Sequence, residues 1–300
     1  MNGRLAVLVL LVPVILVAQT PAPVPPPASQ NPSPMIETTR AHRRIDRKDL
    51  AGSRSTLRIG DRDVPLFVPE SAGDAKTVDL IVHFHGAAWL AEMSAASLGK
   101  PVAVATVHAG AGSRAYASAF ASPEEFESLL TAASEALAPR TIGGIWLTGF
   151  SAGHGAIRSI LGQPAGEKVR GILLLDGLHT GYVPDRKVLA DGGALDASNL
   201  EAFARFAREA AAGRRRMVIT HSEIFPGTFA STTETADWLI AQLGLRRTPV
   251  VKWGPVGMQQ LSEVHKGNLH ILGFAGNSAP DHVDHFHGMP EFLAALIVDR

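Results

Sequence analysis

The stretch from residue 145 to residue 155 constrains the fold more than any other part of the sequence. A run of large apolar side chains, typical of a buried strand, leads into Gly149-Phe150-Ser151-Ala152-Gly153 and then into a helix start rich in small residues. A serine in a G-x-S-x-G pattern sits on a sharp strand-to-helix turn, because its small neighbours let the backbone turn without a clash. The turn exposes the Ser151 hydroxyl and leaves the Ala152 amide at a helix N-terminus, where it can stabilise negative charge. A chance Gly/Ser-rich turn is the alternative, but the flanking strand and helix favour a nucleophilic serine.

Strands and helices alternate along the rest of the chain. The expected strands lie at 78–84, 102–107, 142–147, 169–175, 216–220 and 268–274. The expected helices follow Ser122 and Ser231, cover 199–212 and end the chain at 290–298. Repeated strand–helix units predict an α/β fold with a mostly parallel central sheet and helices on both faces. Two short runs around a Gly-Asp turn, between residues 54 and 69, predict an antiparallel hairpin at the sheet edge.

Composition excludes several kinds of function. The 300 residues are 46% hydrophobic and 19% charged, as expected for a globular protein with a sizeable core. Lys and Arg balance Asp and Glu at 28 each, which argues against nucleic acid or an anionic membrane as a partner. The absence of cysteine excludes disulfides, a thiol nucleophile and thiolate metal ligands.

The N-terminal region is predicted to lie outside the folded domain. Arg4 precedes an apolar run at 5–17 that is too short to span a bilayer, so residues 1–18 are predicted to be a signal peptide, with the cleavage position left open. Residues 19–49 are expected to form a Pro-rich linker and polar lead-in, and residues 50–300 a single α/β domain. We therefore expect an exported protein, periplasmic or extracellular, without a stable membrane anchor.

The first strand of the parallel sheet ends in a turn suited to binding an oxyanion. Functional groups in such sheets gather at the carboxyl ends of the strands, and the strand 78–84 is followed by His85-Gly86-Ala87. A His-Gly-small turn exposes a backbone amide, here that of Ala87, beside the serine. The amides of Ala87 and Ala152 are therefore the predicted oxyanion hole.

A serine nucleophile needs a base, and the base needs an orienting acid. Asp176 directly follows the strand 169–175, where a carboxylate is costly to bury unless it is hydrogen-bonded. Glu223, after the strand 216–220, is the alternative acid. We favour Asp176, and the carboxylate that is not used is expected to be an ordinary loop group.

The run 280–292 follows the last strand, where a loop with the base belongs. Three histidines and two aspartates within it also allow a zinc site. We disfavour zinc because ligands confined to one short loop are poorly placed for a tetrahedral site, and no His-x-x-x-His helix is present.

Taken together, the 149–153 stretch, His85-Gly86 and the histidine-containing run resemble the α/β-hydrolase superfamily from about residue 54 to the C-terminus. The lead-in 64–86 is similar to the secreted esterase and polyester-depolymerase branches. The resemblance implies that His282, the first histidine of the run, is the base, with His285 as the alternative. Two departures stand out: most members place the acid after the later strand, and this oxyanion turn lacks consecutive glycines.

The resemblance implies a serine hydrolase that uses no cofactor and no metal. Ser151 would attack an ester carbonyl, His282 would take its proton, and Asp176 would orient the imidazole. The expected substrate is a small or polymeric ester, and residues 108–120 and 176–199 are expected to form the rim of its site. A peptidase or amidase with the same triad and a non-catalytic binding protein on this fold are the alternatives.

Overall fold

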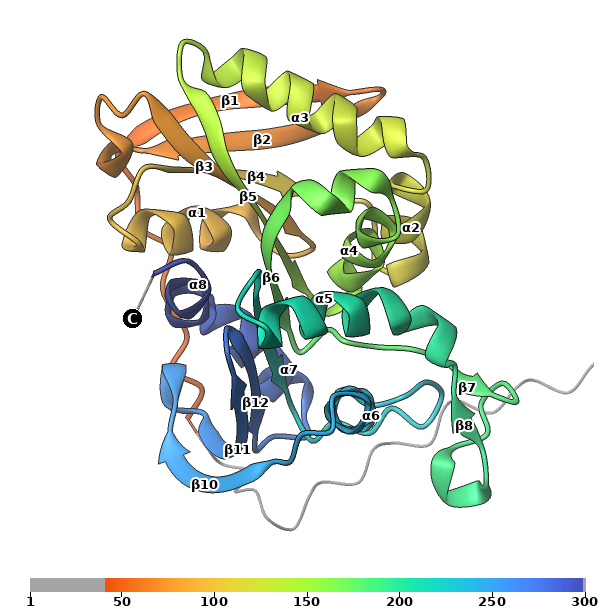
Figure 1. The fold of residues 1–300 in the computed structure, drawn as a ribbon. Coiled ribbons are helices and arrows are strands. Elements are labelled where there is room, and N and C mark those ends of the chain that lie inside the picture. The colour runs from red at the N-terminus through yellow and green to blue at the C-terminus, as the bar shows by residue number, and fades with distance from the viewer. Residues whose placement is uncertain (1–40, 299–300) are drawn as a thin grey trace, which may run out of the picture.

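The computed structural model describes residues 41–298. Its centre is a ten-stranded sheet in the order β1-β2-β4-β3-β5-β6-β9-β12-β11-β10 (Figure 1). Neighbours from β4 to β12 in this order pair parallel, and the strands at both edges pair antiparallel. The strands are β1 (Gly52–Ile59), β2 (Arg62–Pro69), β3 (Thr77–Phe84), β4 (Val102–Val107), β5 (Thr141–Phe150), β6 (Val169–Leu175), β9 (Arg216–His221), β10 (Thr248–Trp253), β11 (Gln259–Lys266) and β12 (Leu269–Phe274). The predicted α/β fold with a mostly parallel sheet is confirmed.

Helices cover both faces of the sheet. The helices are α1 (Ala88–Ser97), α2 (Ser113–Ala119), α3 (Pro123–Leu137), α4 (His154–Leu161), α5 (Glu201–Ala211), α6 (Thr232–Gln242), α7 (Ala279–His287) and α8 (Met289–Ile297). One hydrophobic core packs α2 to α6 against the sheet, and a second packs α1, α7 and α8 against the other face (Figure 1). In β3, Leu80 and Val82 belong to the first core and Ile81 to the second, because successive side chains of a strand point to opposite faces.

The predicted edge hairpin is present. β1 and β2 pair antiparallel from Gly52 opposite Pro69 to Ile59 opposite Arg62. β2 also pairs with β4, but only through Leu66 and Phe67. The missing amide of a proline at residue 65 therefore leaves no gap in that second ladder.

Residues 279–287 form the helix α7, so the predicted loop is wrong there. Ser278 and Asp281 form a capping box at the start of α7, with Pro280 in its first turn. A Ser-x-x-Asp pattern with a proline inside it, at the first helical turn, is a helix-start signal, which the many histidines and aspartates obscured. The sequence analysis also did not predict α1, α2 and the antiparallel strands β10 and β11. β10 lacks an alternating hydrophobic pattern because nearly all of its residues are exposed.

The predicted signal peptide and most of the predicted linker lie outside the described residues. The stretch that precedes β1 contacts α7, where the His42 ring lies 2.6 Å from the Asp284 carboxylate and the Ile45 amide donates to His287 Nδ1. Within residues 41–298, no helix combines the length and apolar character needed to cross a membrane.

Buried neutral histidines are expected to make the fold sensitive to acid. Burial lowers the pKa of His83, His154 and His221 to about 3, whereas each takes up a proton near pH 6.5 once unfolded. Their folded-state pKa values lie below the unfolded ones, so stability is complete above about pH 6.5 and falls as the pH is lowered, by about 2 kcal/mol per histidine at pH 5. Thermal unfolding at pH 7 and pH 5 measures this, and a melting temperature that does not change between them would contradict it. His83→Asn should reduce the slope of the unfolding free energy against pH by the equivalent of about one proton.

Candidate active site

Ser151 sits on a strained turn at the carboxyl end of β5. Its φ of +47° is unusual for a residue with a side chain, and such strain is typical of a nucleophile lifted above a sheet. At the neighbouring glycines, Gly149 and Gly155, there is little space for a side chain. A Cβ on Gly149 would lie 3.0 Å from Ile157 Cδ1, and a Cβ on Gly155 would lie 2.1 Å from the Ser113 carbonyl oxygen. Gly149 therefore allows the end of β5 to pack closely on α4, and Gly155 allows α4 to press against α2.

The turn after β3 packs directly against the Ser151 turn. His85 and Gly86 have φ values of +71° and +114°, and Ala87 is extended at the start of α1. A Cβ on Gly153 would lie 2.2 Å from the Phe84 carbonyl oxygen, so the two turns are in backbone contact. Ala87 and Ala152, whose backbone amides are the predicted oxyanion hole, therefore lie on adjoining turns.

His85, which opens this turn, is anchored from the side. Its Nδ1 atom lies 2.9 Å from the hydroxyl of Tyr116, whose side chain is fully buried, and its ring stacks with that of Phe150 at 5.9 Å. Burial lowers the pKa of His85, with further lowering from nearby His108 and His282. The ring is therefore held as a neutral group beside the turn.

Asp176 follows β6 and is almost fully buried, with 1% of its surface exposed. Its Oδ1 atom accepts from the Ser222 amide at 2.8 Å and the Thr232 hydroxyl at 2.6 Å. Its Oδ2 atom accepts from the Ser222 hydroxyl at 2.8 Å and lies 2.6 Å from His282 Nδ1. Burial alone would raise the pKa of Asp176, but His285, His282 and the donated hydrogen bonds hold it well below its usual range.

Asp176 also lies close to the serine. Its own φ is +42°, and a Cβ on the next residue, Gly177, would lie 2.8 Å from the Ser151 carbonyl oxygen and 2.9 Å from its amide nitrogen. The carboxylate is therefore fixed on a turn that touches the backbone of the Ser151 turn.

Glu223, the alternative acid, is placed differently. Its side chain is exposed, and its amide donates to the Gly276 carbonyl at 2.8 Å. Within residues 41–298 its carboxylate has no hydrogen bond to a histidine. Although the residue is exposed, neighbouring groups partly desolvate its carboxyl and raise the pKa of Glu223, so it lacks the stabilised negative charge found at Asp176.

His282 stands in the first turns of α7 beside the serine turn. Its ring lies 4.6 Å from that of Phe150, the residue before Ser151, and its side chain is 24% exposed. Because Nδ1 faces Asp176, Nε2 is the ring nitrogen left to exchange protons.

The other histidines of the 280–292 run face elsewhere. His285 is buried, with Nδ1 2.8 Å from the Thr220 hydroxyl, and burial lowers its pKa. His287 accepts from the Ile45 amide. The three histidines of the run therefore do not converge on one metal position. Within residues 41–298, His42, Asp281 and Asp284 form the group with metal-ligand spacing, and the Arg44 guanidinium already lies 3.4 Å from the Asp284 carboxylate.

A cavity of about 570 Å³ opens beside Ser151. Its walls come from the start of α2, from the Ser151 turn and α4, and from residues 179–181, together with Asn199 and Phe229. This agrees with the expected rim at 108–120 and 176–199.

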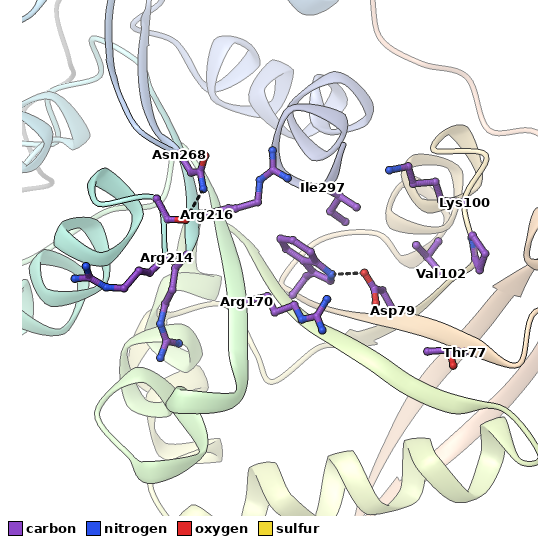
Figure 2. A pocket seen from close by; sticks show the side chains of 13 residues that line it. Thr77, Asp79, Lys100, Val102, Arg170, Arg214, Arg216, Asn268 and Ile297 are labelled. Atoms are coloured by element: carbon purple, nitrogen blue, oxygen red, sulfur yellow. Dashed lines mark hydrogen bonds between the residues drawn. The ribbon is translucent and has the colours of Figure 1, made fainter. Parts of the chain in front are cut away.

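A second cavity, of about 620 Å³, lies at the opposite end of the sheet (Figure 2). Thr77, Val102 and Arg216 line it from the amino ends of their strands, far from the carboxyl ends that hold Ser151 and Asp176. Among its described lining residues the carboxylate is that of Asp79, which accepts a hydrogen bond from the Trp146 indole at 2.9 Å. Because the described residues that line this cavity include neither a histidine nor a paired nucleophile, the smaller cavity is the candidate active site.

Comparison with solved structures identifies the architecture. The chain is similar to a structure of FAE, with a TM-score of 0.50 and 12% sequence identity over 90% of this chain and 96% of that chain. The chain has the α/β-hydrolase fold. It is also similar to EstE1, a thermophilic carboxylesterase from a metagenomic library, with a TM-score of 0.48 and 12% identity over 84% of this chain and 91% of that chain. No protein-family model and no curated protein matches the sequence.

Sequence reasoning on this α/β-hydrolase fold missed the groups that hold the acid. Ser222 and Thr232 belong to no motif that marks them as partners of Asp176. Their signals were weak: Ser222 directly follows a buried strand, and Thr232 follows the capping serine of α6. Arg114 and Arg158, which line the cavity beside Ser151, had no signal in the sequence pattern either.

Proposed function

We propose that this protein is a serine hydrolase that cleaves carboxylic esters through an acyl-enzyme. The observation that supports it best is the contact of 2.6 Å between His282 Nδ1 and a buried Asp176 carboxylate, on turns that adjoin a strained serine. A nucleophile, an orienting acid and a base in this order along the chain, Ser151, Asp176 and His282, match the requirements of acyl transfer.

Each residue has a definite part in the proposed reaction. Ser151 Oγ attacks the ester carbonyl while His282 Nε2 removes its proton, and the imidazolium that forms faces the Asp176 carboxylate. The amides of Ala87 and Ala152 stabilise the tetrahedral oxyanion. His282 then protonates the departing alcohol, activates a water that attacks the acyl-enzyme, and returns the proton to Ser151.

The hydrogen bonds around Asp176 explain why this acid suits the base. Three donors from Ser222 and Thr232 satisfy the carboxylate and keep it ionised at neutral pH. An ionised acceptor at Nδ1 holds the proton on that nitrogen, so Nε2 is free to accept the serine proton. The proposal includes export, because the sequence begins with a predicted signal peptide; N-terminal sequencing of protein recovered outside the cytoplasm tests this.

Labelling with a fluorophosphonate probe tests the proposed function. The purified protein should be labelled, and Ser151→Ala should abolish labelling because the probe needs an activated serine. His282→Ala should reduce labelling at least 100-fold, whereas His285→Ala should retain a substantial part of it. Labelling that depends on His285 instead would move the base, and a folded protein that is not labelled at all would refute the proposal.

A further inference from the structure

The cavity beside Ser151 has an unbalanced charge. Among the described residues that line it are two arginines, Arg114 and Arg158, and neither aspartate nor glutamate. Two histidines also line it, but burial lowers the pKa of His154 to about 3 and lowers that of His179 as well, so both are neutral at pH 7. The lining therefore presents positive charge and no negative charge to whatever enters.

Arg158 is placed to face the reacting end of a substrate. It lies on α4, which begins at His154 directly after the Ser151 turn, and both Arg158 and Ser151 line the cavity. Side chains on a helix lean toward its N-terminus, so the guanidinium is directed back toward the Ser151 turn.

The guanidinium of Arg158 has no ion pair. Within residues 41–298 it makes neither a hydrogen bond nor a salt bridge, although its side chain is partly buried. Burial lowers the pKa of Arg158, and the nearby carboxylate of Asp196 offsets only part of that effect. However, Asp196 already accepts from Ser198 and Asn199 and lies outside salt-bridge distance. A partly desolvated charge without a partner gains most from an ionic ligand.

Arg114 extends the positive charge to the mouth of the cavity. It lies in the first turn of α2 and is exposed, and within the described part of the chain it has no ion pair. α2 is pressed against α4, because a Cβ on Gly155 would lie 2.1 Å from the Ser113 carbonyl oxygen. Arg114 and Arg158 therefore line the same cavity from adjoining helices.

We propose that this cavity selects esters that carry a carboxylate several bonds from the scissile carbonyl, with Arg158 as its main contact and Arg114 at the entrance. The inference deepens the proposed ester hydrolysis and depends on it. A planar guanidinium binds a carboxylate through two parallel hydrogen bonds, which adds both affinity and orientation. A guanidinium recognises a carboxylate in the same way on either part of the ester. The proposal therefore covers a carboxylate on the acyl part and one on the alcohol part.

Two matched pairs of substrates test the proposal. For the acyl side, 4-nitrophenyl hydrogen adipate is compared with 4-nitrophenyl hexanoate, which replaces the distal carboxylate by a methyl group. For the alcohol side, 4-acetoxybenzoate is compared with its methyl ester. We expect kcat/KM to favour the anionic member of at least one pair by about 10- to 100-fold, and this preference to weaken as salt is added.

Variants assign the preference to the arginines. Arg158→Met should reduce the ratio of kcat/KM for anionic over neutral ester at least 10-fold, mainly through KM, and Arg158→Lys should retain part of it. Arg114→Met should reduce the ratio less, because this side chain is exposed. Arg205→Met is the matched control, since it removes an exposed arginine of α5 outside the cavity.

The outcomes separate this inference from the proposed function. Neutral esters that are cleaved without any preference for the anionic members would overturn the inference and leave the hydrolase standing. A preference that survives Arg158→Met and Arg114→Met together would also overturn it. If the wild-type protein cleaves none of the four esters and is not labelled by the fluorophosphonate, the proposed function itself fails.

Discussion

Asp176→Asn is expected to reduce kcat/KM for a neutral ester by about 10⁴-fold. The side-chain amide would donate a hydrogen bond where the carboxylate accepts one, so Nδ1 of His282 would have to become the acceptor. The proton would then reside on Nε2, and that nitrogen could no longer take the proton of Ser151. Steady-state kinetics measure the loss.

The control for this prediction is Glu223→Gln. Glu223 follows β9, where the sequence allowed an alternative acid, but the residue is exposed and makes no hydrogen bond with His282 in the described chain. We expect its loss to change kcat/KM less than about threefold. Retained activity in Asp176→Asn together with a large loss in Glu223→Gln would show that the acid is wrongly assigned. Thermal melting of both variants separates lost catalysis from lost folding. This is needed because the side-chain amide introduced by Asp176→Asn would also face the hydrogen-bond donors of Ser222 and Thr232, which destabilises the fold.

Gly153→Ala is expected to destabilise the protein by at least about 3 kcal/mol. The φ of Gly153 is −59°, which any residue can adopt, so the effect comes from space alone. The new Cβ would lie 2.2 Å from the carbonyl oxygen and 2.8 Å from the carbonyl carbon of Phe84. These are backbone atoms of β3, the strand beside β5, and they cannot move without separating the Ser151 turn from the oxyanion turn.

The matched control is Gly162→Ala at the other end of α4. Its φ is −79°, and the nearest atoms to a new Cβ lie at 3.4 and 3.6 Å, which is ordinary contact. We expect this variant to differ from the wild type by less than about 1 kcal/mol. Chemical denaturation compares the two, and equal stability of Gly153→Ala and Gly162→Ala would disprove the steric argument.

The order of the elements could be predicted because it depends on local patterns. Apolar runs of six or seven residues marked β3, β4 and β6, and a capping box at Ser231 marked the start of α6. The errors have local causes too. The histidine-rich start of α7 did not look apolar enough for a helix, and β10 lacks an alternating pattern because its residues are exposed on both sides.

By itself, the sequence determined the strand–turn–helix around Ser151, because glycines at residues 149, 153 and 155 allow close approaches that a Cβ would obstruct. Only the tertiary structure shows the contacts that favour Asp176 over Glu223. The partners of Asp176 come from residues 46, 56 and 106 positions away along the chain, and no local pattern records such contacts. They meet because parallel strands end at one edge of the sheet, and a buried carboxylate is stable only where several donors converge.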